Sequence, residues 1–143
     1  MIVAHKVQSK KHYEDALSVR RTVFIEEQAV PPDLEVDEFE DSAVHFVAYD
    51  ETRPIGAGRV RLLPDAIAKV ERICVLPDYR GKHIGNSLMD EIEKEAKLQG
   101  CRQLKLNSQT SAIPFYEKRH YTISSPEFMD AGIPHKTMIK EIY

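Results

Sequence analysis

A short basic segment between two apolar stretches is the part of this chain best suited to binding a charged ligand. It connects a strand-like run at 69–75 to a helical pattern, and it reads Arg80-Gly81-Lys82-His83-Ile84-Gly85. The N–H groups of such a turn and of the first helical turn have no partner within the chain, and the helix dipole adds positive potential there. Glycine also lets the backbone approach an anion without a Cβ in the way. The segment therefore predicts a phosphate-binding loop.

The loop lacks the Gly-Lys-Ser/Thr ending of a Walker loop and the G-x-G-x-x-G spacing of a dinucleotide-binding turn. It resembles the acetyl-CoA pyrophosphate loop of the GNAT N-acetyltransferase superfamily, whose motif reads Gln/Arg-x-x-Gly-x-Gly/Ala. Arg80 and Gly85 fill the first and last positions of that motif. His83 stands where the family usually has its middle glycine, so either the backbone path differs there or the side chain points outward. The other interpretation is an ordinary connection between a strand and a helix.

The resemblance implies that acetyl-CoA is a co-substrate and that the loop binds its pyrophosphate through Arg80, Gly81, Lys82, His83, Ile84 and Gly85. It also implies that the pantetheine arm hydrogen-bonds to the backbone of Ile73, Cys74 and Val75, much as an added strand would. Asn107, at the end of the following strand, is expected to touch the cofactor. The alternative for Asn107 is a residue that begins the turn after its strand.

Tyr116 lies in a second segment that is similar to the GNAT pattern, in which an aromatic-Tyr pair precedes the final hairpin. The resemblance implies that its hydroxyl lies near the CoA sulfur and protonates the leaving thiolate, as a general acid. The alternative is a packed tyrosine whose hydroxyl merely finds a partner. His120 takes the place of the glycine that usually follows in this pattern.

Two residues are candidates for the base that would accept a proton from an amine. Glu71 lies on the strand before the loop, where many GNAT sequences carry Glu-x-x-x-Val, and it could act directly or through water. The alternative for Glu71 is an ion pair with Arg59 or Arg61. His135 is the second candidate, because neutral imidazole suits proton transfer near pH 7. A lone histidine in a loop is otherwise a solvated surface residue.

The pattern of apolar residues predicts the elements that position these side chains. We expect strands at 2–7, 44–49, 55–63, 69–75, 103–107, 121–124 and 136–143. Helices are expected from residue 10 to before Pro31, from Ile84 towards Gly100, and over 111–119, and a loop at 132–135. This order indicates one α/β (α+β) domain over residues 1–143. Its GNAT-like fold would have a mixed, mostly antiparallel sheet flanked by helices, with strands splayed at the cofactor cleft.

Composition narrows the classes of function. The chain has 143 residues, 42% hydrophobic and 30% charged, which fits one globular domain. The net charge of −3 gives no basic footprint for nucleic acid. No apolar run is long enough to span a membrane and the first residues do not form a signal peptide, so we expect a cytoplasmic protein. Cys74 and Cys101 are expected to be reduced core residues, and the histidines show no metal-ligand spacing.

Segments 20–28, 35–37 and 130–135 resemble small bacterial GNAT proteins of the ElaA and YjcF type. The Arg-x-x-Val-Phe part also looks like the start of acyl-homoserine-lactone synthases, which share the fold. The acidic stretch 33–41 would favour a cationic acceptor, although runs of charge are usually solvated surface.

These observations predict an acetyl-CoA-dependent N-acetyltransferase that transfers the acetyl group directly to an amine in a ternary complex. Cys74 is expected in the strand core without a histidine beside it in sequence, which disfavours an acyl-cysteine route. A backbone N–H, that of Val75, would polarise the thioester carbonyl. The alternatives are an enzyme similar to the lactone synthases and a non-catalytic CoA-binding module. The acceptor would be a small amine or an exposed amino group, and the family often forms homodimers.

Overall fold

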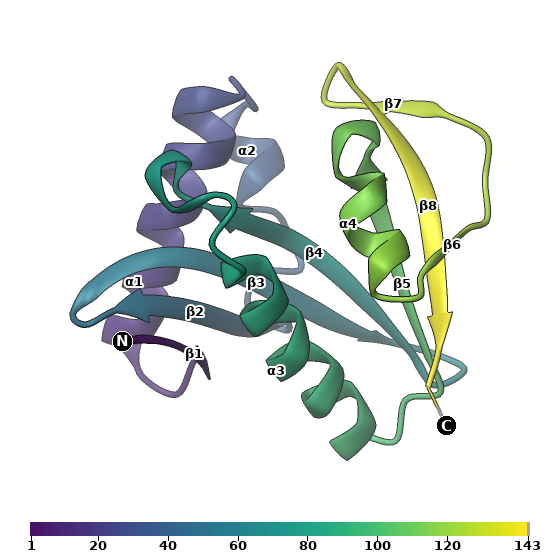
Figure 1. The fold of residues 1–143 in the computed structure, drawn as a ribbon, viewed down its shortest axis with the longest axis horizontal. Coiled ribbons are helices and arrows are strands. Elements are labelled where there is room, and N and C mark those ends of the chain that lie inside the picture. The colour runs from purple at the N-terminus through teal and green to yellow at the C-terminus, as the bar shows by residue number, and fades with distance from the viewer. Residues whose placement is uncertain (143) are drawn as a thin grey trace.

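An eight-stranded sheet organises the computed structural model, which describes residues 1–142 (Figure 1). The strands follow the order β1-β2-β3-β4-β5-β8-β6 across the sheet, and β7 pairs with β8. Only β4 and β5 are parallel, so the predicted mixed and mostly antiparallel sheet is confirmed. The strands are β1 (Ile2–Lys6), β2 (Val44–Asp50), β3 (Arg53–Leu63), β4 (Ile67–Val75), β5 (Gln103–Gln109), β6 (Thr122–Ile123), β7 (Phe128–Asp130) and β8 (Ile133–Glu141).

Helices cover both faces of this sheet: α1 and α2 lie on one face, and α3 and α4 on the other (Figure 1). The α-helices are α1 (Lys10–Arg20), α2 (Pro32–Glu35), α3 (Ile84–Leu98) and α4 (Ile113–Lys118). A π-helical segment, η1 (Arg21–Glu27), continues α1, and two 3₁₀ turns are η2 (Pro77–Tyr79) and η3 (Thr110–Ala112). No helix within residues 1–142 is both long and apolar enough to cross a membrane.

The apolar stripe of α3 explains why this helix packs on the sheet. Ile84, Leu88, Ile92 and Ala96 recur every four residues and are all 2% exposed or less. This spacing places them on one face of a helix, where they join the core under β1 to β4. The chain leaves the helix just before Gly100, whose φ of 78° suits glycine, as the sequence predicted.

The strands β4 and β5 separate part of the way along their length, which confirms the predicted splay. They pair only from Ile67–Val70 on β4 to Gln103–Leu106 on β5, although both strands continue beyond these points. A bulge in β4 helps to turn its end away, because Arg72 has a φ of 61° and the register with β3 shifts there. The divergence leaves the backbone edges of two strands facing a gap.

The C-terminal hairpin differs from the prediction in one respect that affects the site. Pro134 and His135 were expected in a loop, but β8 begins at Ile133 and pairs with β7 through Phe128↔His135 and Met129↔Pro134. Gly132-Ile133-Pro134 resembles a turn in sequence, because glycine and proline usually interrupt strands. His135 therefore has a fixed position on a strand and is not a solvated loop residue.

Candidate active site

A cavity of about 860 Å³ opens where β4 and β5 diverge. All but one of the predicted site residues line it. They are Glu71, Ile73, Cys74, Val75, Arg80, Gly81, His83, Ile84, Gly85, Asn107, Tyr116 and His135. The exception is Lys82, which is exposed and whose Nζ lies 5.3 Å from the centre of the Tyr79 ring. The fold thus brings together residues from four separate parts of the sequence.

The backbone of the phosphate-binding loop offers a row of free donors. Within residues 1–142, the six N–H groups from Gly81 to Asn86 donate to no protein acceptor. The first bond of α3 runs from the N–H of Ser87 to the carbonyl of His83, at 3.2 Å. Six consecutive donors at the start of a 15-residue helix are suited to an anion such as a pyrophosphate.

His83 keeps the backbone conformation that a glycine would adopt. Its φ is 65° and its ψ is 18°, in the left-handed region, and its side chain is exposed. Of the two alternatives left open by the sequence, a different backbone path is therefore not needed, and the exposure of His83 agrees with the other. A non-glycine residue in this conformation costs on the order of 1 kcal/mol.

Gly85 serves helix packing as well as access to the loop. A Cβ at this position would lie 3.1 Å from Cζ of Phe115, on α4, and the glycine has no positive φ. The absent side chain thus lets the Phe115 ring approach α3. Sequence reasoning assigned Gly85 to the pyrophosphate alone, because the two residues are 30 positions apart in the chain.

Arg80 is paired within the protein. Its guanidinium forms a bidentate ion pair with the Glu27 carboxylate, with N···O distances of 2.7 and 2.8 Å. Its Nε donates to the carbonyl of Val75 at 3.1 Å. Both side chains are about 40% exposed. The pair connects the end of η1 to the loop. Glu27 thus partly compensates the positive charge of Arg80 before any ligand binds.

Tyr116 lies on α4 with 7% of its surface exposed. Its ring meets those of Phe115 and Tyr121 edge-on, with centres 4.9 and 5.6 Å away. Burial, with a smaller contribution from the nearby Cys74, raises the pKa of the phenol above its usual value. Within the described chain the hydroxyl makes no hydrogen bond, so it remains protonated at neutral pH and free to bind a ligand.

Cys74 does not have the surroundings of a nucleophile. Burial raises the pKa of its thiol to about 12, and within residues 1–142 its one hydrogen bond is a 3.9 Å contact to the carbonyl of Ala57. A thiolate, which is the reactive form, is therefore scarce at neutral pH. Cys74 and Cys101 are both buried and unpaired, as predicted.

Glu71 is held by two arginines, the alternative that the sequence had left open. Its Oε1 lies 2.9 Å from Nη2 of Arg59 and 2.9 Å from Nε of Arg61. Burial alone would raise the pKa of Glu71, but Arg61 and Arg59 outweigh burial and hold the pKa below its ordinary value. A carboxylate whose pKa is lowered in this way is a weak base.

His135 is oriented by its neighbours and is only 8% exposed. Its Nδ1 lies 2.7 Å from the carbonyl of Ile133, and its ring stacks on Phe128 with centres 6.0 Å apart. A carbonyl can only accept a hydrogen bond, so Nδ1 carries the hydrogen. The lone pair of Nε2 is then available in the neutral ring.

Three of the acidic residues in segment 33–41 face arginines, whereas Asp33, Glu38 and Asp41 are exposed. Glu35, Asp37 and Glu40 bind Arg20, Arg59 and Arg72 in a continuous network of ion pairs. Arg20 and Arg59 have no exposed side-chain surface. The electrostatic argument for a cationic acceptor therefore loses its main support, because arginines neutralise these carboxylates.

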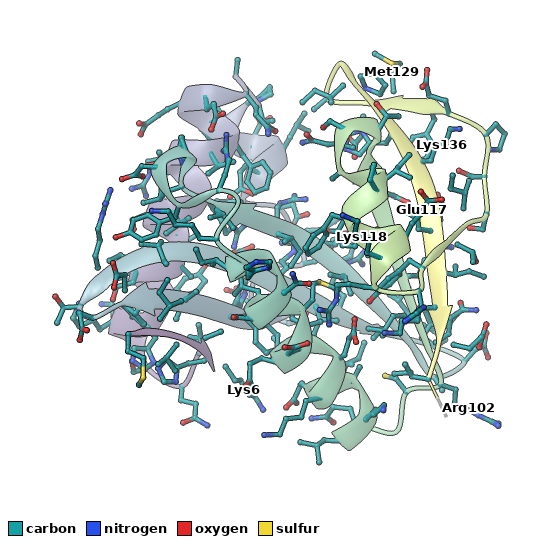
Figure 2. The ribbon with its side chains drawn as sticks, viewed as in Figure 1. Lys6, Arg102, Glu117, Lys118, Met129 and Lys136 are labelled. Atoms are coloured by element: carbon teal, nitrogen blue, oxygen red, sulfur yellow. The ribbon has the colours of Figure 1, made fainter. Side chains whose placement is uncertain are left out.

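The structure adds polar residues that sequence reasoning did not single out. Gln109 on β5 donates to Gln28 at the end of η1, at 2.9 Å, and so connects the two sides of the cavity. Thr137 on β8, also not singled out, donates at 2.9 Å to Asn107, which the sequence had predicted to touch the cofactor. Lys118 lies on α4, and its side chain also lines the cavity (Figure 2). Residues 28 and 109 are 81 positions apart, which is why no local pattern indicates their contact.

Comparisons with known proteins agree with this arrangement. The sequence profile of the acetyltransferase (GNAT) domain matches residues 7–142. The uncharacterised N-acetyltransferase YjcF of Bacillus subtilis is 44% identical over 135 residues, which cover 94% of this chain and 96% of YjcF.

Solved structures share the whole fold. A candidate N-acetyltransferase from Lactobacillus plantarum superposes with a TM-score of 0.92 at 25% identity, over 99% of both chains. Escherichia coli ElaA superposes with a TM-score of 0.86 at 20% identity, over 99% of this chain and 100% of ElaA. The profile match and the identity to YjcF are sufficient to classify the chain. It belongs to the GNAT acetyltransferase family and is an acyltransferase of that type.

Proposed function

We propose that this protein transfers an acetyl group from acetyl-CoA directly to an amine while both substrates are bound. The observation that carries the proposal is a single cavity that contains both the free N–H groups of residues 81–86 and the unpaired hydroxyl of Tyr116. The first feature suits a pyrophosphate and the second suits a leaving thiolate.

The edge of β4 is suited to hold the pantetheine arm and the thioester. The N–H of Leu76 donates to Ile55 on β3, at 2.9 Å. Because N–H groups alternate in direction along a strand, those of Val75 and Ile73 point the other way, into the gap beside β5. They can bind amides of the arm and polarise the thioester carbonyl. Asn107 faces the same cavity from β5.

Each bond change then has a residue to assist it. The amine nitrogen attacks the carbonyl carbon, the C–S bond breaks, and Tyr116 gives its proton to the thiolate sulfur. The amine proton leaves to a base on the cavity wall. The free Nε2 favours His135 for that step, and Glu71, the base predicted from sequence, remains the alternative through a bridging water.

The replacement Tyr116→Phe tests this proposal, because it removes only the hydroxyl. We expect acetyl-CoA turnover, measured by release of free thiol, to fall by about 10²-fold while calorimetric affinity for acetyl-CoA stays unchanged. Tyr121→Phe is the matched control, since its ring packs against Tyr116 but its hydroxyl binds Glu93 at 3.0 Å. Binding without thiol release from any amine would instead indicate a non-catalytic CoA-binding module.

A further inference from the structure

We propose that the acceptor is an amino acid with an apolar side chain, whose carboxylate binds the ammonium group of Lys69. The inference rests on the proposed function, and it specifies the class of amine. It starts from a charge that the cavity leaves without a partner. The sequence suggested a positively charged acceptor, whereas the structure favours one that also carries a negative group.

Lys69 is a half-buried residue of β4 that lines the cavity. Within residues 1–142 it makes no ion pair and no hydrogen bond. The arginines of the cavity wall are occupied, because Arg72 lies 2.7 Å from Glu35 and Arg80 lies 2.7 Å from Glu27. Lys118 also lines the cavity, but it is exposed to solvent, so its charge carries little desolvation cost. A partly buried ammonium without a counter-ion is unfavourable. A bound carboxylate would relieve that cost, and an ammonium group would increase it.

The neighbouring carboxylates cannot form an ion pair with Lys69 without giving up contacts to the arginines that they already bind. Four arginines and four carboxylates pair among themselves beside it, so that this network is neutral: Arg20, Arg59, Arg61 and Arg72 with Glu35, Asp37, Glu40 and Glu71. The remaining acid of the cavity wall, Asp130, is exposed at the rim on β7. Burial lowers the pKa of Lys69 and nearby Glu71 opposes this, with smaller effects from Arg61, Lys105 and Asp130.

The position of Lys69 suits the acceptor and not the cofactor. It lies just before the point where β4 and β5 separate, opposite Lys105 in the register. Ile73 lies four positions further along β4, about 13 Å away at the usual rise, and the thioester is expected beyond it. A lysine side chain and a small amino acid can span this distance together. Lys69 would also disfavour the protonated form of the acceptor amine nearby.

The remaining wall explains why the acceptor's side chain should be apolar. Val23 and Phe24 of η1, Val30 between η1 and α2, and Leu34 of α2 line the cavity. Leu34 is 53% exposed, so this part of the wall offers apolar surface that a ligand can cover. An amino acid such as leucine would direct its carboxylate to Lys69 and its side chain to this surface.

The test compares leucine with 3-methylbutan-1-amine, which is leucine without its carboxylate. The measured quantity is the ratio of the two kcat/KM values in the thiol-release assay. Because that ratio is compared between proteins, differences in intrinsic amine reactivity cancel. We expect Lys69→Met to lower the ratio about 10- to 100-fold, the usual value of a charge-assisted hydrogen bond. Lys69→Arg should largely preserve it.

Lys105→Met is the matched control. It removes an ammonium group from the same face of the sheet, directly across from Lys69, but Lys105 does not line the cavity. It should leave the ratio unchanged. An equal loss for both acceptors in Lys69→Met would overturn the inference.

A binding experiment separates this inference from the proposed function. Leucine titrated calorimetrically into the CoA complex should bind wild type more tightly than Lys69→Met, whether or not turnover occurs. Binding without thiol release would contradict the proposed transfer reaction and still support the carboxylate site. Equal binding of leucine to the two proteins would refute the carboxylate site even if amines are acetylated.

Discussion

His135 and Glu71 line the same cavity, but their surroundings give them different capacities to accept a proton. Nε2 of His135 has no hydrogen-bond partner within residues 1–142, whereas Arg59 and Arg61 already bind the Glu71 carboxylate. We expect His135→Asn to lower kcat/KM at pH 7 by about 10²-fold and to give a rate that rises with pH. Without a base, only acceptor molecules that are already deprotonated in solution can react.

The control for this prediction is Glu71→Gln, which preserves shape and should keep the wild-type pH profile of kcat/KM. The opposite pattern, a rising profile in Glu71→Gln and a normal one in His135→Asn, would assign the base to Glu71 as the sequence first suggested. Unfolding curves of both variants are needed alongside, because Glu71→Gln leaves two arginines without a full partner.

At the scale of elements, the approach of α4 to α3 depends on one missing side chain. Gly85→Val should weaken acetyl-CoA binding, but the structure gives two possible reasons: obstruction of the pyrophosphate and displacement of the Phe115 ring. The double replacement Gly85→Val with Phe115→Leu distinguishes them. If ring displacement dominates, calorimetric affinity should recover by about 10-fold relative to Gly85→Val alone, because contacting residues are energetically coupled. No recovery would indicate obstruction of the loop.

The elements that the sequence predicted well are those whose signals are local. The four-residue repeat of α3 and the glycine after it defined that helix, and the run 69–75 defined most of β4. The start of β8 was missed because Gly132 and Pro134 resemble a turn, while pairing with β7 makes the segment a strand. Tertiary pairing decided the structure there, and a single sequence does not show it.

Across the whole molecule, resemblance to the GNAT family predicted a cofactor cleft, and nearly all of the predicted residues line the cavity, but it did not predict how the charged residues pair. The sequence presents 33–41 as an acidic stretch, whereas the fold places arginines from α1, β3 and β4 against it. Those partners are 15 to 37 residues away in the chain, so no local pattern indicates them. That Lys69 lacks an ion-pair partner can be recognised only once the ion pairs between this segment and the arginines are known.

The same network makes the stability of the whole protein sensitive to acid. The hydrogen bonds from Arg59 lower the pKa of Asp37 to about 2. For Glu40, burial works in the opposite direction, but Arg20 and Tyr13 outweigh it and lower the pKa to about 2. Because both folded-state values lie below the unfolded ones near 4, these groups stabilise the fold above about pH 4. That stabilisation is lost as the pH falls towards 2.

We therefore expect the free energy of unfolding, measured with urea at a series of pH values, to decrease steadily between about pH 5 and pH 2. Asp37→Asn should be less stable than wild type at pH 7 and should show a shallower decrease, because one of the titrating groups is gone. Asp33→Asn is the control, since Asp33 is exposed in the same segment and has no ion-pair partner within residues 1–142. If Asp37→Asn and Asp33→Asn followed the same pH dependence as wild type, the arginine network would not be the source of acid sensitivity. The loss would then have to come from carboxylates elsewhere, such as Glu93 beside Arg119 and Lys140.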